Sequence, residues 1–224
     1  MADLRNNPTD ARKRTFLFEL LCFAGEFDRA EKHLALLAEA GPDAATGCLL
    51  YRAALAAERS RHDLFQKKEY PPVAESTPVR GTWNGEPFES LEDIDSRIGP
   101  RIEIFAAGQY MWLPLAHVTS IEIQAPKKLR DLLWAPALVR TGKAFKGQEL
   151  GEVLIPVLSP FSFRHSDDAV RLGRSTVWET QEDGVFPYGQ KMFDLDGDEV
   201  PILELRKLEL ADPQSASESR AAAE

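Results

Sequence analysis

The sequence predicts an α+β protein, with helices in the first third of the chain and an antiparallel β-rich domain after them. Two runs, 101–105 and 117–123, alternate apolar and polar residues with the period of half-buried strands. Before residue 70, apolar residues instead recur at spacings of three and four, the period of an amphipathic helix. Glycines and prolines separate the later short runs, which favours an antiparallel sheet over a parallel sheet with long helices.

Changes in composition divide the chain into four segments. Residues 1–70 are predicted to form a tetratricopeptide-like helical domain, and the proline-containing stretch 71–80 an extended linker. Residues 81–210 are predicted to form the β-rich domain. The tail 211–224 is rich in alanine, serine and glutamate and is predicted to be disordered, because it has little apolar surface to bury.

The helical segment contains three periodic stretches, at 11–24, at 28–40 and from 43 to 65. Gly41 and Pro42 end the second stretch in the usual order of helix termination. The stretch 25–42 is similar to the second half of a tetratricopeptide repeat, although an ordinary three-helix bundle is the alternative. In a repeat arrangement, the first helix would line a binding groove. The residues expected to face that groove are Arg12, Thr15, Glu19 and Phe23.

The β-rich segment begins with a hairpin turn at Asn84-Gly85. Ser90 has capping-box spacing to Asp93, which predicts a short helix over 91–98. The two alternating runs are expected to form one antiparallel unit around the aromatic block 110–112, and Pro126 opens one or two helical turns. Further strands are expected at 137–140, 153–158, 170–172, 191–195 and 200–208.

The charge distribution argues against nucleic acid as a partner. The chain of 224 residues has a net charge of -9, and residues 71–224 carry 16 basic and 25 acidic side chains, so that 16 − 25 = -9 lies in this part. A nucleic-acid-binding protein usually presents a basic face. No run reaches the about 18 apolar residues that span a bilayer, and no signal-peptide pattern is present, so we expect a cytoplasmic protein that does not enter a membrane.

No pattern typical of a catalytic, metal or cofactor site is found. Cys22 and Cys48 lie among apolar residues and are predicted to be buried thiols of a reducing compartment. The histidines and cysteines lack metal-ligand spacing, and there is no glycine-rich phosphate-binding loop. The acidic stretch 194–199 fits a β-turn better than a calcium loop, and 164–168 fits a polar loop better than a hydrolytic triad.

The segment 172–178 has two interpretations. Arg174 could bind a carboxylate while it stacks on Trp178, with Gly173 allowing the turn. Alternatively, the segment closes the β domain, with Arg174 held by an internal acid such as Asp131. The same choice applies to Arg130.

A family resemblance rests on motifs that follow one another through most of residues 80–200, at 83–88, 93–100, 109–114, 128–134, 136–137, 152–158, 172–178 and 189–193. The chain resembles the ImpE/TagJ/SciE-type accessory proteins of bacterial type VI secretion systems, and its N-terminal helices fit the layout of that family. It departs from the family pattern at Ser159 and at Val177, where many members have tyrosine and aspartate.

The resemblance implies a non-enzymatic adaptor without cofactors. Such a protein would bind a helix of the small contractile-sheath subunit, near the ATPase that disassembles the sheath, by a helix-in-groove contact. The alternatives are a generic tetratricopeptide-type module with another cytoplasmic partner, or an enzyme of unrecognised type acting through Arg130, Asp131 and Arg174. The β-domain motif residues, as structural groups or a second contact, are Trp112, Arg130, Asp131, Trp134, Gly173, Arg174 and Trp178.

Overall fold

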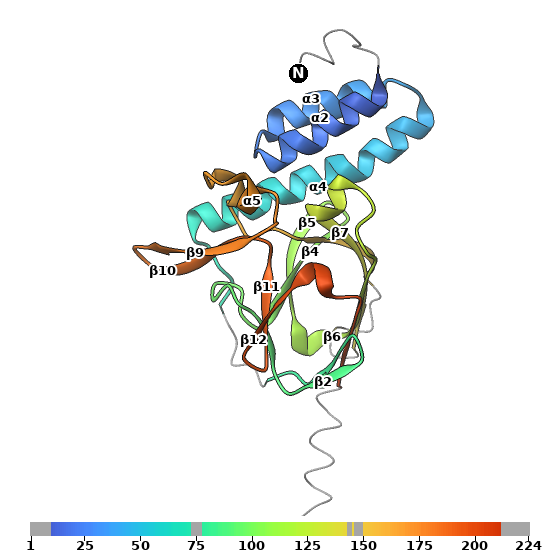
Figure 1. Cartoon of the computed structure of the whole chain (residues 1–224). Coiled ribbons are helices and arrows are strands. Elements are labelled where there is room, and N and C mark those ends of the chain that lie inside the picture. The colour runs from blue at the N-terminus through green and yellow to red at the C-terminus, as the bar shows by residue number, and fades with distance from the viewer. Residues whose placement is uncertain (1–9, 73–77, 143–144, 146–149, 212–224) are drawn as a thin grey trace, which may run out of the picture.

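The computed structural model describes residues 10–72, 78–142, 145 and 150–211. Three helices come first: α2 (Ala11–Phe23), α3 (Phe27–Ala38) and α4 (Pro42–Lys67). Figure 1 shows α4 lying between the α2–α3 pair and the strands. The three predicted helices are therefore confirmed. Whether they form a tetratricopeptide-like repeat stays a prediction, and the predicted tail lies almost wholly outside the described residues.

Local signals explain where the helices begin and end. The Asp10 carboxylate accepts a hydrogen bond from the backbone N–H of Lys13 (3.1 Å), which caps α2. Gly41 precedes α4 as its N-cap, Pro42 is the first residue of α4, where a proline is favourable, and Lys68 ends α4 in the left-handed conformation (φ 56°). α4 continues for 26 residues, long enough for one face to contact α3 while another contacts the sheet.

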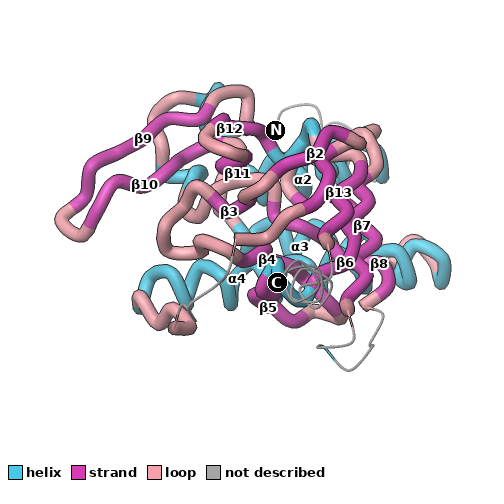
Figure 2. The backbone as a smooth tube through the Cα atoms, turned by 90° about the horizontal axis from the view of Figure 1, so that it is seen from below, coloured by secondary structure: helices cyan, strands magenta, loops and turns pink. Residues whose placement is uncertain are grey.

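The β-rich part is built from three antiparallel sheets, seen from below in Figure 2. The largest has eight strands in the order β2-β1-β13-β6-β7-β8-β4-β5, the second has the order β12-β11-β3, and β9 and β10 form a separate pair. The strands are β1 (Gly81–Trp83), β2 (Glu86–Phe88), β3 (Leu91–Asp93), β4 (Arg101–Ala106), β5 (Gln109–Pro114), β6 (Val118–Ile123), β7 (Trp134–Thr141), β8 (Gly151–Pro156), β9 (Thr176–Gln181), β10 (Gly184–Gly189), β11 (Met192–Leu195), β12 (Asp198–Pro201) and β13 (Lys207–Leu210).

Short helical elements connect the strands. They are η1 (Leu115–His117), η2 (Leu129–Leu132), η4 (Ser162–Arg164), α5 (Asp168–Arg171) and η5 (Ile202–Glu204). The turn between β1 and β2 confirms the predicted Asn84-Gly85 hairpin. The acidic stretch 194–199 is a β-turn, as expected, because the Asp194 carboxylate accepts a hydrogen bond from the N–H of Gly197 (2.8 Å).

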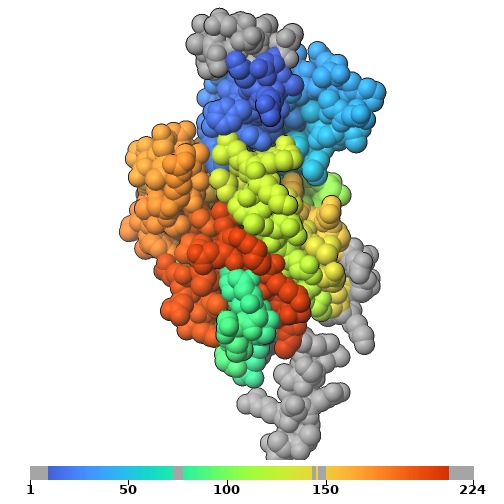
Figure 3. Space-filling view, turned by 45° about the vertical axis from the view of Figure 1, so that its right-hand side comes forward, coloured from blue at the N-terminus to red at the C-terminus, as the bar shows by residue number. Residues whose placement is uncertain are grey.

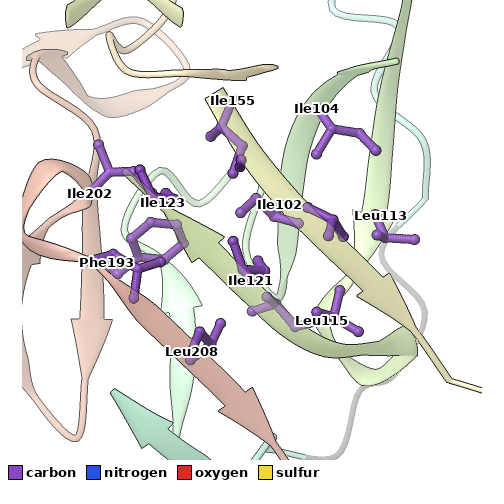
Figure 4. Close-up of a cluster of buried hydrophobic side chains, with 14 of the residues drawn as sticks. Ile102, Ile104, Leu113, Leu115, Ile121, Ile123, Ile155, Phe193, Ile202 and Leu208 are labelled. Carbon is purple, nitrogen blue, oxygen red and sulfur yellow. The ribbon is translucent and has the colours of Figure 1, made fainter. Parts of the chain in front are cut away.

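Two apolar cores hold the fold together. In the first, side chains of the large sheet pack against Phe193 and Ile202 (Figure 4). The second combines residues of the helices, such as Phe18 and Leu55, with residues of the β part, such as Trp134 and Leu158. Each fully buried side chain of this size contributes about 1.5–3 kcal/mol, so the shared second core fixes the helices on the sheet.

The predicted pairing of the two alternating runs is wrong. β4 pairs with β5 and β8, whereas β6 pairs with β7 and β13, so that β7 and β8 separate the two strands. The reason is that the aromatic block 110–112 is itself part of β5. Ala107 (φ 48°) and Gly108 (φ 79°) form a tight hairpin turn that returns the chain alongside β4.

Three other predicted elements also differ from the structure. The helix expected over 91–98 is β3 followed by turns, since the N–H of Ser90 binds the Asp196 carboxylate (2.7 Å) and 91–93 pair with β11. The strand expected at 170–172 is α5, which is capped by the Asp167 carboxylate (2.8 Å to the N–H of Ala169). The run 200–208 is interrupted by η5, and the β9–β10 hairpin was not anticipated.

Candidate functional site

A buried network of charged side chains joins α4 to the sheet. Arg61 of α4 donates from Nε to Oε1 of Glu103 (2.7 Å) and from Nη2 to Oε2 (2.9 Å). Its remaining donors reach Oε1 of Glu58 (3.1 Å) and the carbonyl oxygen of Leu158 (3.0 Å). Arg61 is 1% exposed and Glu103 is 0% exposed, so both charges depend on these internal partners.

The network continues into the second sheet through Lys191. Its ammonium lies 2.7 Å from Oε2 of Glu103 and also pairs with the Asp93 carboxylate. The hydroxyl of Tyr110 donates to Oε1 of Glu103 (2.5 Å). Glu103 in the middle of β4 therefore receives donors from α4, from β5 and from the residue that precedes β11. These contacts join three elements that are far apart in the sequence.

Glu58 forms the other end of the network. It accepts hydrogen bonds from the indole Nε1 of Trp134 (2.8 Å) and lies 3.2 Å from Nε2 of His62. His62 stacks between the rings of Phe27 and Phe161, at centroid distances of 5.3 and 5.2 Å. Trp134 is thus held at the junction by a hydrogen bond as well as by apolar packing.

The network changes the pKa values of its carboxyl groups in opposite directions. Burial opposes ionisation of Glu58, but Arg61 and His62 outweigh it and lower the pKa of Glu58 to about 2. Burial also opposes ionisation of Glu103, but Arg61 and Lys191 hold its pKa well below the usual range. Burial raises the pKa of Asp93 to about 7 against the effect of Lys191, and the charges of Asp95 and Glu103 add to the rise.

We expect Glu58→Gln to weaken the acid sensitivity of the fold. The lowered pKa of Glu58 gives stability that is fully present above its ordinary pKa of 4.5 and is lost as the pH falls towards 2. The shift corresponds to at most about 3 kcal/mol. Urea unfolding at a series of pH values should therefore show a smaller loss below pH 4.5 in E58Q than in the wild type.

Asp93→Asn provides the test of opposite sign. The raised pKa of Asp93 gives stability that is present below its ordinary value of 3.8 and is lost as the pH rises through about 7. In D93N the loss of stability between pH 3.8 and about pH 7 should be absent, whereas the loss of stability at acid pH should remain. Identical pH profiles for the wild type, E58Q and D93N would contradict this description of the network.

A surface groove lies between α4 and strands β4, β7 and β8 of the large sheet, and we call it the junction groove. It has a volume of about 160 Å³, and its lining is mainly apolar. Leu50 of α4 is 53% exposed and lines the groove, and so do Arg130 and Asp131 of η2. In Figure 3 the η2 segment, in yellow-green, lies directly against the blue helices. The lining residues are Leu50, Tyr51, Ala53, Ala54, Phe105, Ala107, Gly108, Arg130, Asp131, Trp134, Pro136, Glu152, Val153 and Leu154.

Three of the predicted motif residues meet at this groove. The guanidinium of Arg130 lies over the ring of Tyr51 (4.4 Å to the centroid) and 3.9 Å from the carboxylate of Glu19. Asp131 accepts from the N–H groups of Lys127 (2.8 Å) and Lys128 (2.9 Å), so it caps η2 and does not hold Arg174. Trp134 is buried between the groove and the charge network.

The other four motif residues lie elsewhere. Trp112 stacks against Tyr70 and lies under the guanidinium of Arg101 (4.3 Å). Gly173 is buried with φ +66° beside Leu158, where it permits the turn after α5. Arg174 and Trp178 are exposed at the base and in the middle of β9. Segment 172–178 is therefore separate from the junction groove lining.

The four residues predicted to face a helical groove are divided by the structure. Arg12 is exposed, and the Thr15 hydroxyl donates to the carbonyl oxygen of Ala11 (2.9 Å). Glu19 and Phe23, in contrast, are buried, Glu19 facing Arg130 and Phe23 in the second core. The end of α2 that was expected to be open thus packs on the β part.

Sequence reasoning missed the charge network. Arg101–Phe105 looked like a half-buried strand, yet all five residues are buried, because β4 is covered on both faces. Glu103 stands between two isoleucines, but this pattern indicates a buried charge only if β4 is known to be covered on both faces. Cys22 and Cys48 are free and buried, as predicted. The structure groups no set of His, Cys, Asp or Glu residues suited to a metal ion within its described ranges.

Comparisons with known proteins agree with this layout. The family model described as "ImpE protein" matches residues 85–209, which cover the β-rich part from the first hairpin to β13. The chain belongs to the ImpE family. This ImpE-family chain is also 30% identical over 240 residues to the type VI secretion system accessory component TagJ of Pseudomonas aeruginosa, a match that covers 92% of the chain and 83% of TagJ.

The fold of the ImpE-family chain is also found in an experimental structure. The crystal structure of protein VPA1032 from Vibrio parahaemolyticus superposes with a TM-score of 0.81 at 23% identity, over 96% of this chain and 92% of that one. The similarity extends over the helices as well as the sheets. Separately, none of the helices within the described ranges is both long and apolar enough to cross a membrane.

Proposed function

We propose that this chain is a non-enzymatic accessory protein of a type VI secretion system that acts in the cytoplasm. It binds a helical segment of the small contractile-sheath subunit, close to the ATPase that disassembles the sheath. The support is its membership of the ImpE family, its similarity to TagJ over most of both chains, and the junction groove. The groove is the single structural observation that carries the binding proposal.

The groove has the properties that a helix-in-groove contact needs. Its floor is apolar, with Phe105 and Leu154 at the base and Leu50 exposed at the rim. Arg130 and Glu152 add charged groups at its edges, which would fix the orientation of an amphipathic helix. A partner helix would cover side chains that are otherwise exposed to water.

An enzymatic role is less well supported by the geometry. Arg130 is engaged by Tyr51 and Glu19, and Asp131 is engaged by backbone N–H groups. Arg174 lies outside the groove lining, so these three polar residues do not converge on one described cavity. The name of the relative TagJ, an accessory component, points the same way.

Leu50→Asp is expected to weaken binding of the sheath-subunit helix by tenfold or more, which corresponds to about 1.4 kcal/mol. A carboxylate at this position would have to lose water against an apolar floor. The measurement is calorimetric titration of the purified chain with a synthetic peptide of the sheath subunit's N-terminal helix. Leu36→Asp on α3 is the matched control, because Leu36 is 45% exposed and lies outside the groove.

Two results would contradict the proposal. If the folded wild-type chain gives no binding heat with the peptide and no change in peptide helicity, the helix is not its ligand. If L50D and L36D weaken binding equally, the ligand does not occupy the junction groove.

A further inference from the structure

The β9–β10 hairpin projects from the body of the molecule as a two-stranded arm (Figure 2). The register pairs Trp178 with Pro187 and Glu179 with Phe186, which assigns the side chains to two faces. One face packs on the body, where Phe186 lies against the guanidinium of Arg97 (4.1 Å). The opposite face carries Trp178, 40% exposed, and Val185, 52% exposed. A two-stranded hairpin alone is marginally stable, so its exposed apolar side chains indicate a contact surface.

The register also decides which edge of the arm can accept another strand. The turn Glu182-Asp183 joins Gln181 to Gly184, so this closing pair is a hydrogen-bonded pair and the pairs alternate from there. Thr176, Trp178 and Thr180 therefore direct their N–H and C=O groups away from β10. Within the described residues, no backbone partner outside β10 contacts these groups.

The other edge of the arm is blocked. On β10, the corresponding outward position 187 is a proline, which has no N–H to donate. Proline on an edge strand is a common device against strand addition. Three of the six β10 residues are also buried, whereas Trp178 to Gln181 of β9 are all exposed. Of the outward positions on β10, Pro187 has no N–H, and Gly189 is bonded to Ser162 and Ser159. β9 is therefore the edge that offers three successive outward positions.

We propose that β9 pairs with β9 of a second copy of this chain, forming a four-stranded antiparallel sheet across a twofold axis. When Trp178 is placed opposite its own copy, Thr176 lies opposite Thr180, and Arg174 lies opposite Glu182. Thr176, Trp178 and Thr180 share one face and carry the outward backbone groups, and Arg174 and Glu182 flank the strand at its two ends. The segment is thus complementary to itself in charge. A register centred on residue 179 would place Glu179 opposite its own copy, and the repulsion between the two carboxylates disfavours that register.

The contact is small, so the dimer should be weak. Three facing residue pairs supply about six backbone hydrogen bonds and one aromatic contact, so the buried area is well below that of a standard protein interface. The expected dissociation constant of the dimer is therefore on the order of 10–100 µM. This inference does not depend on the proposed function, because the arm is separate from the junction groove.

The first test is sedimentation of the full chain from about 5 µM to about 1 mM, a range that brackets the expected constant. We expect a shift from the 25.0 kDa monomer to twice that mass. Thr180→Pro removes an outward N–H of β9 and should weaken the dimer at least about tenfold. Val185→Pro, its cross-strand neighbour on β10, is the matched control and should leave the dimer within about twofold.

The second test addresses the register by charge exchange. Arg174→Glu and Glu182→Arg should each weaken self-association, because like charges then oppose one another across the axis. An equimolar mixture of the two single variants should associate again, since each variant supplies the charges that the other lacks. The double variant R174E/E182R should likewise associate with itself.

Several outcomes would overturn the inference. A chain that stays monomeric to about 1 mM has no such contact, and the free edge would then serve a strand of another protein. A dimer that T180P and V185P weaken equally does not use the β9 edge. A dimer whose charge variants do not recover on mixing uses a register other than the one proposed.

Discussion

Replacing Arg61 with methionine is expected to lower the free energy of unfolding by about 3–5 kcal/mol. The guanidinium is the common partner of Glu103 and Glu58, and all three side chains are buried. Methionine fills a similar volume but leaves two carboxylates without their main counter-charge. Because Arg61 is on α4 and Glu103 is on β4, the variant should also loosen the helices from the sheet. Urea unfolding followed by circular dichroism and tryptophan fluorescence measures both effects.

Arg59→Met is the matched control for R61M. Arg59 is on the same helix and pairs with Asp28 (2.9 Å) and Glu31 (2.8 Å), but these pairs are exposed to solvent. Exposed pairs contribute at most about 1 kcal/mol, so R59M should be close to the wild type. In a double-mutant cycle, adding E103M to R61M should cost less than E103M alone. Equal losses in R61M and R59M would show that the network does not stabilise the fold.

Gly189→Ala is expected to destabilise the chain by about 3 kcal/mol or more. Gly189 has φ +110°, and a Cβ built there would lie 2.0 Å from the carbonyl oxygen of Ser175. The N–H of Gly189 donates to the hydroxyl oxygen of Ser162 (2.9 Å), and its carbonyl oxygen accepts from the N–H of Ser159 (2.8 Å). Thermal denaturation should therefore show a clear fall in Tm, with the β9–β10 arm detached from its base.

Gly197→Ala is the control that shows how much of the cost of G189A comes from backbone strain alone and how much from the steric clash with Ser175. Gly197 also has a positive φ (+95°), but no atom lies within 4 Å of a Cβ built there. Its substitution should cost only the conformational strain, about 1–2 kcal/mol. If G189A were no worse than G197A, the contact with Ser175 would not constrain the arm.

Local features of the sequence predicted much of the secondary structure. The spacing of apolar residues and the Gly41-Pro42 break gave α2, α3 and α4, and the Asn84-Gly85 turn gave the first hairpin. Alternation located β4 and β6, and motif order gave the family. These features were readable because helix periodicity, turn conformation and chain breaks depend on residues close together in the sequence.

Strand pairing and the charge network depended on the tertiary structure. No local pattern shows that β7 and β8 lie between β6 and β4, or that Glu103 is covered on both faces. Glu19 and Phe23 of α2 are buried because the β part covers them: Arg130 of η2 lies against Glu19, and Phe23 shares the second core with Trp134. The network partners come from positions as far apart as 61 and 191, and a pair of charges becomes strong only when folding removes both from water. The sequence by itself thus determined the three N-terminal helices, the first hairpin turn and the family, whereas long-range packing decided which charges are buried together and which surfaces stay open.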